Sequence, residues 1–84
     1  MQTREVLDSV VRVLSPYLGA TMARASAHAH CQRLGIGDGE ISRDQVEQLV
    51  GKIAHGLAVF VGREKSVVIA DEIRKAVGLS GAQA

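Results

Sequence analysis

The residues with the most evident capacity for chemistry lie in the segment His28-Ala29-His30-Cys31, because histidine and cysteine are common ligands of zinc. On a helix, side chains two positions apart diverge by about 160°, so His28 and His30 cannot share one metal ion. His28 and Cys31 are three positions apart and can converge. A structural zinc needs four ligands. The sequence therefore predicts no metal centre and no cofactor, and its weak candidate ligands are His28, Cys31 and His55.

Nucleophilic catalysis is the second chemistry that these residue types suggest. Ser26 and Cys31 each have histidines nearby in the sequence, but a catalytic histidine is usually oriented by a third group such as a carboxylate. No Asp or Glu lies between Asp8 and Asp38. A chain of 84 residues also has little room for a substrate pocket of about 300 Å³ or more. We therefore expect that the protein is not an enzyme.

The charges do not form the basic stripe that is typical of a nucleic-acid-binding protein. Ten Lys and Arg residues stand against nine Asp and Glu residues, and aromatic residues make up only 2% of the chain. A small DNA-binding regulator of the helix-turn-helix kind is the alternative hypothesis, because the last two predicted helices join through Gly62. Its base-reading side chains would be Arg63, Ser66 and Arg74.

Helical spacing of the apolar residues predicts four helices. They cover about 3–14, 16–34, 43–61 and 64–77, with a glycine-rich loop over 35–42 and a frayed tail over 79–84. Ser15 and Pro16 suit the start of the second helix, although the first helix could also continue through a kink at Pro16. Ser42 and Gln45 have the spacing of a capping box.

The second and third predicted helices are apolar on more than one face. In the second, Ala23, Ala27 and Cys31 lie on one side, and Met22 belongs to a strip that is nearly opposite. The third is apolar around its whole circumference near its end, which is typical of a helix buried on all sides. Four short helices cannot easily bury two of their number completely. We therefore expect a homodimer, with an interface or core made by Ala20, Ala23, Ala27, Cys31, Leu57, Val59, Phe60 and Val61.

Two glycines in the interior of the third predicted helix support close approach of another backbone. Gly51 and Gly56 each cost up to about 1 kcal/mol relative to Ala at such positions. That cost is easier to understand if a neighbouring chain must come near the helix.

Together these patterns predict one all-α domain over residues 1–84, a small four-helix bundle completed by homodimerisation. Its expected function is that of a non-enzymatic protein–protein interaction module, a regulatory or assembly subunit that binds itself or a different protein. A single cysteine and the lack of a signal-peptide core favour the cytoplasm. No apolar run approaches the roughly 20 residues of a membrane span, so no membrane partner is expected.

Overall fold

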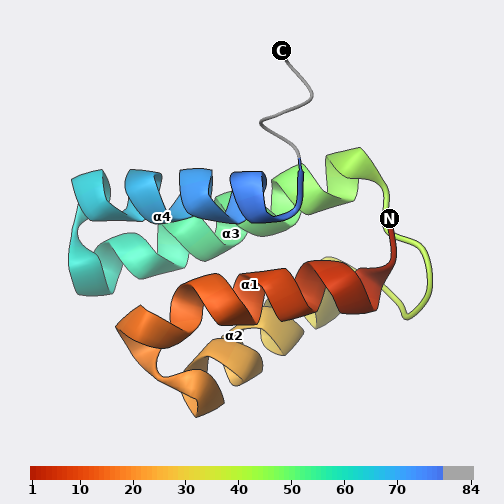
Figure 1. The fold of residues 1–84 in the computed structure, drawn as a ribbon, viewed down its shortest axis with the longest axis horizontal. Coiled ribbons are helices and arrows are strands. Elements are labelled where there is room, and N and C mark those ends of the chain that lie inside the picture. Colours follow the sequence, from red (N-terminus) through yellow and green to blue (C-terminus); the bar gives the residue numbers. More distant parts are fainter. Residues whose placement is uncertain (79–84) are drawn as a thin grey trace.

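The computed structural model describes residues 1–78 and confirms the all-α prediction. Its helices are α1 (Thr3–Leu18), α2 (Ala20–Arg33), α3 (Arg43–Val61) and α4 (Arg63–Ala76). Figure 1 shows that α1 and α2 form one antiparallel hairpin and that α3 and α4 form another. The predicted frayed tail over 79–84 lies outside the described residues.

A single glycine makes each hairpin turn. Gly19 has φ 85° and ψ 154°, and Gly62 has φ 89° and ψ 159°. A side chain would strain this backbone, so glycine is required at both positions. Both turns lie at the same end of the bundle, at the left in Figure 1. We call this the hairpin end.

The two hairpins bury residues at equivalent positions, and the separation in sequence between equivalent residues is the same throughout. The long helices bury Val6, Val10 and Leu14 in α1 and Leu49, Ile53 and Leu57 in α3. The short helices bury small side chains four and eight residues after each glycine, namely Ala23, Ala27, Ser66 and Ala70. Small residues at the contact allow the two helix axes of a hairpin to come close together. The face of the second helix that carries Ala23 and Ala27 therefore packs inside one chain.

The prediction that a helix starts at Ser15 and Pro16 is wrong. Helix α1 continues through Pro16 to Leu18, and α2 begins only after Gly19. Proline is tolerated here although it removes one backbone donor. The Ser15 hydroxyl donates to the Val11 carbonyl oxygen at 2.6 Å, and the backbone N–H of Gly19 donates to the Ser15 carbonyl oxygen at 2.8 Å. The break falls where the backbone needs a positive φ.

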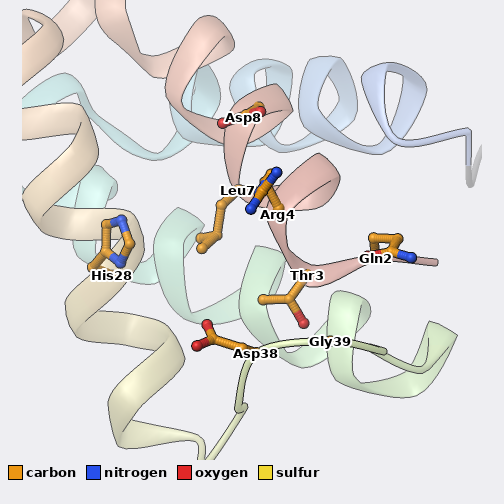
Figure 2. A pocket seen from close by; sticks show the side chains of 8 residues that line it. All are labelled: Gln2, Thr3, Arg4, Leu7, Asp8, His28, Asp38 and Gly39. Atoms are coloured by element: carbon orange, nitrogen blue, oxygen red, sulfur yellow. The ribbon is translucent and has the colours of Figure 1, made fainter.

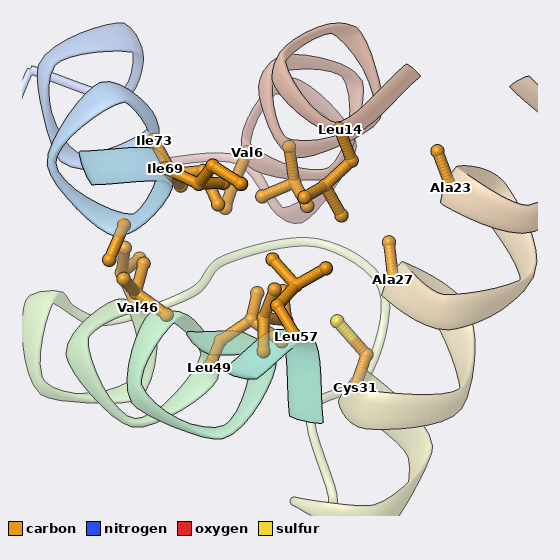
Figure 3. Close-up of a cluster of buried hydrophobic side chains, with 14 of the residues drawn as sticks. Val6, Leu14, Ala23, Ala27, Cys31, Val46, Leu49, Leu57, Ile69 and Ile73 are labelled. Carbon is orange, nitrogen blue, oxygen red and sulfur yellow. The ribbon is translucent and has the colours of Figure 1, made fainter. Parts of the chain in front are cut away.

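The core between the hairpins is aliphatic (Figure 3). Its largest fully buried side chains are Leu14, Leu49, Ile53, Ile69, Ile73, Val10, Val46 and Val50. Both aromatic residues, Tyr17 and Phe60, stay exposed. The core therefore depends on many small contacts.

The connection from α2 to α3 is fastened to the start of α1. Ile36 and Ile41 are buried, the Thr3 hydroxyl donates to the Gly37 carbonyl oxygen at 3.0 Å, and the Thr3 N–H donates to the Gly39 carbonyl oxygen at 2.7 Å. The predicted capping box at Ser42 is present, with both reciprocal hydrogen bonds to Gln45. The hydrogen bonds from Thr3 to Gly37 and Gly39 hold the loop before α3 against the start of α1.

We expect Leu49→Ala to lower the free energy of unfolding by about 2–5 kcal/mol, because it removes a fully buried side chain and leaves a cavity. Urea unfolding followed by circular dichroism measures the change. The matched control is Val59→Ala, at a position that is 84% exposed, which should change stability by less than about 0.5 kcal/mol. Equal effects of the two substitutions would contradict the assigned core.

Candidate functional site

The structure divides the predicted interface residues into two groups. Four of them, Ala23, Ala27, Cys31 and Leu57, are buried in the chain's own core, where Figure 3 shows the three from α2 facing Leu14 and Leu57. Ala20, Val59 and Phe60 are exposed, and Val61 is half-buried. The first group is core, and only the second remains available to a partner.

Exposed apolar side chains gather at the hairpin end. Among the described residues, the large hydrophobic side chains that are exposed, apart from Met1, lie within six positions of Gly19 or Gly62; they are Tyr17, Met22, Val59, Phe60, Val67 and Val68. Val59 is 84% and Phe60 is 76% exposed. The sequence interpretation missed Tyr17, Val67 and Val68. A usable signal was that Tyr17 and Phe60 each stand two residues before a turn glycine.

Tyr17 is anchored even though it is exposed. Its hydroxyl donates to the Glu72 carboxylate at 3.0 Å, which ties the end of α1 to α4. This hydrogen bond raises the pKa of Tyr17. The anchored ring therefore presents a defined apolar surface at the hairpin end.

A groove runs between α2 and α3, which contact each other less than α1 and α4 do. Three adjoining hollows form it, and their residues change character along its length. The half near the hairpin end is apolar and is lined by Tyr17, Leu18, Met22, Ile53, Leu57 and Phe60. The other half is lined by Arg33, Leu34, Gln48, Gly51, Lys52 and His55. We call these the apolar half and the cationic half.

His30 lies where the two halves of the groove meet. Its Nε2 atom would be 3.8 Å from a Cβ placed on Gly56, so the ring packs over that glycine. Partial burial lowers the pKa of His30, and the charges of Arg33 and Lys52 lower it further. The imidazole is therefore neutral at pH 7 and serves as part of the packed floor of the groove.

The glycines of α3 have no intramolecular reason to be glycine. A Cβ at Gly51 would meet nothing within 4 Å, and one at Gly56 would make only an ordinary contact with His30. Both glycines line the groove. The close approach that the sequence suggests at these positions is therefore absent within the described chain.

A second hollow of about 460 Å³ lies between the start of α1, the middle of α2 and the loop (Figure 2). The expectation that a chain of this length has little room for a hollow of about 300 Å³ or more is therefore wrong. His28, Asp8 and Asp38 line the hollow, and Figure 2 shows the two carboxylates at opposite ends. The Thr3 hydroxyl, also on its wall, is already committed to the Gly37 carbonyl oxygen. Within the described residues, no hydrogen bond joins His28 to Asp8 or Asp38.

The candidate metal ligands are not brought together. His28 faces the hollow of Figure 2, His55 lines the cationic half of the groove, and Cys31 is buried in the core, where desolvation raises the pKa of its thiol. Within residues 1–78, no three His, Cys, Asp or Glu side chains are placed to hold a metal ion. The sequence-adjacent His28 and Cys31 thus belong to different environments.

Of the three proposed DNA-reading residues, Arg63 is exposed as expected, and Ser66 is not. Ser66 was expected to face outward, but it is buried and its hydroxyl donates to the Arg63 carbonyl oxygen at 2.7 Å. Arg74 pairs with Glu47 at 3.1 Å and with Asp71 at 3.4 Å. Helices α3 and α4 lie side by side as a hairpin with a one-residue turn, whereas helix-turn-helix pairs cross at about 90–120°.

We expect Gly51→Ala to raise the free energy of unfolding by as much as about 1 kcal/mol, because alanine restores helix propensity and meets no neighbouring atom. Thermal or urea unfolding measures it. Gly62→Ala is the matched control and should destabilise, since its φ of 89° strains any side chain. A destabilised Gly51→Ala variant would show that α3 packs differently at this point.

We expect an NMR titration to place the pKa of His30 below that of an unperturbed histidine, and Arg33→Gln to raise it, whereas Lys75→Gln should leave it unchanged. As the pH falls, His30 of the unfolded chain is therefore protonated at a higher pH than His30 of the folded chain. The free energy of unfolding should therefore decrease below about pH 6.5 until folded His30 is also protonated. A His30 pKa above the unperturbed value would contradict its burial in the groove.

None of the described helices is long and apolar enough to span a membrane. The chain matches no known protein-family model, no curated protein and no solved structure. The arrangement that remains for function is a surface arrangement, consisting of the apolar hairpin end and the groove between α2 and α3.

Proposed function

We propose that this protein is a non-enzymatic interaction module that self-associates through the hairpin end and acts as a regulatory or assembly subunit. The observation that carries the proposal is the gathering of exposed Tyr17, Met22, Val59, Phe60, Val67 and Val68 around the two glycine turns. Exposed apolar side chains that gather on one part of a protein are typical of an interaction site. A second copy of the chain supplies a matching apolar surface for a two-fold dimer.

The energetics of burial support this role. Removing a Val, Met or Phe side chain from water contributes about 1.5–3 kcal/mol, and Val59 and Phe60 alone leave most of their surface accessible. The aliphatic core of the chain is small, and association is one of the common ways in which small domains gain stability. The residues predicted as interface that stay exposed, Ala20, Val59 and Phe60, all lie at this end.

The arrangement of polar groups favours binding over catalysis. Ser26 and His30 both line the groove, one helical turn apart, but the residues that line it include no carboxylate to orient the histidine. The hydroxyls of Thr3, Ser15 and Ser66 donate to backbone carbonyl oxygens. These groups stabilise the fold, and we assign none of them a catalytic role.

Light scattering after size exclusion, over a tenfold concentration range, tests the proposal. We expect twice the chain mass for the wild type and the monomer mass for Val59→Glu, because a carboxylate at this exposed apolar position must be desolvated in the dimer. Gln32→Glu, an exposed position near the other end of α2, is the matched control and should remain dimeric. Circular dichroism establishes that both variants are folded.

Two results would overturn self-association through this surface. One is a wild-type chain that stays monomeric at every concentration. The other is a Val59→Glu variant that is folded and has the same mass as Gln32→Glu.

A further inference from the structure

The cationic half of the groove carries positive charge that the chain does not neutralise. Arg33 and Lys52 line it, and no Asp or Glu is among its lining residues. Among the described residues, neither Arg33 nor Lys52 forms an ion pair. By contrast, Arg74 of α4 is paired with Glu47 of α3 and with Asp71 of its own helix. On the side of α3 that packs on α4, Glu47 is therefore paired with a cation, whereas Lys52 on the groove side has no paired carboxylate among the described residues.

The shape of the groove fits a helix. Two antiparallel helices form its walls, and α2 is 14 residues long, or about 21 Å. Met22 and Phe60 stand at the apolar end with 58% and 76% of their surfaces exposed. Gly51 and Gly56 leave the α3 wall without side chains at two points, which permits close approach of another backbone. An amphipathic helix that lies in an apolar groove is a common mode of peptide recognition.

A second copy of this chain is a poor occupant of the groove. In a face-to-face dimer, a two-fold axis along the groove sets the cationic half against its own copy. An axis across the groove sets Arg33 and Lys52 against the apolar half of the other chain, which desolvates unpaired charges. Acidic side chains on a different molecule avoid both costs.

From these observations we infer that the groove between α2 and α3 binds an amphipathic helix of a partner protein, with its apolar residues in the apolar half and acidic residues beside Arg33, Lys52 and His55. The inference goes beyond self-association. The groove shares Tyr17, Met22 and Phe60 with the hairpin end, but it continues along α2 and α3 to Arg33 and Lys52. Val59, which tests the hairpin end, lines none of its hollows.

The experiment uses the full chain and two synthetic peptides of about 16 residues, the length that spans the groove. Both peptides carry leucines at helical spacing. One has glutamates in its N-terminal half, where the helix dipole favours them, and the other has lysines at the same positions. Calorimetry at low and high salt measures binding to the wild type, Lys52→Glu and the control Lys75→Glu.

We expect the wild type and Lys75→Glu to bind the glutamate peptide, with an affinity that falls as salt rises, and to bind the lysine peptide at least about tenfold more weakly. Lys52→Glu should lose at least about tenfold in affinity for the glutamate peptide and gain affinity for the lysine peptide. Circular dichroism of Lys52→Glu establishes that the exposed substitution preserves the fold.

Equal binding of the two peptides, or binding of neither peptide by both the wild type and Val59→Glu, overturns the inference. Binding of the wild type to vesicles of phosphatidylglycerol without binding to the glutamate peptide also overturns it, because the cationic half would then serve a lipid surface. Val59→Glu separates the two proposals. A monomeric Val59→Glu variant that binds the glutamate peptide supports both proposals. A monomeric Val59→Glu variant that does not bind it refutes only the groove, and peptide binding by a monomeric wild type refutes only self-association.

Discussion

Close approach of the two helices within each hairpin is the constraint on which the rest of the structure depends. A one-residue turn leaves no slack, so the first turns of the short helix must lie directly against the last turns of the long one. Ala23 and Ala27 make this possible in the first hairpin, and Ser66 and Ala70 do so in the second. The tight hairpin requires both the glycine conformation and the small residues, because neither would produce it without the other.

The small residues of the first hairpin also determine how α2 packs against α3. All three of its buried residues, Ala23, Ala27 and Cys31, are small, so α2 contributes little bulk toward α3. Helix α3 buries Leu49, Ile53 and Leu57 instead and packs chiefly with α4 and the core. The gap between α2 and α3 is therefore a direct result of the alanine-rich face. The same residues that close the hairpin leave a groove beside it.

The position of the aromatic residues follows from the same limit on volume. A core built for close helix contacts has no space for a ring, and Tyr17 and Phe60 are placed at equivalent exposed positions before the two turns. Because both turns lie at one end, the two rings belong to the same end of the bundle as the other exposed apolar side chains, those of Met22, Val59, Val67 and Val68. Exposed apolar surface of this kind is typical of a site that another molecule covers. For this reason we propose that it serves association and not catalysis in a pocket.

The sequence by itself determined the helical class, the capping box at Ser42 and the end of α3 before Gly62, because hydrophobic spacing, a capping pair and a turn glycine act over a few residues. It did not locate the first break, since Pro16 is a weaker helix stop than the positive φ at Gly19. Nor did it separate core from surface on helices with two apolar faces. Ala23 and Phe60 have the same apolar character in a helical pattern, and only the packing of the hairpins buried one and exposed the other. The groove depends entirely on tertiary structure, because His30, Lys52 and Phe60 are brought into one surface by the relative placement of two helices, which no local pattern encodes.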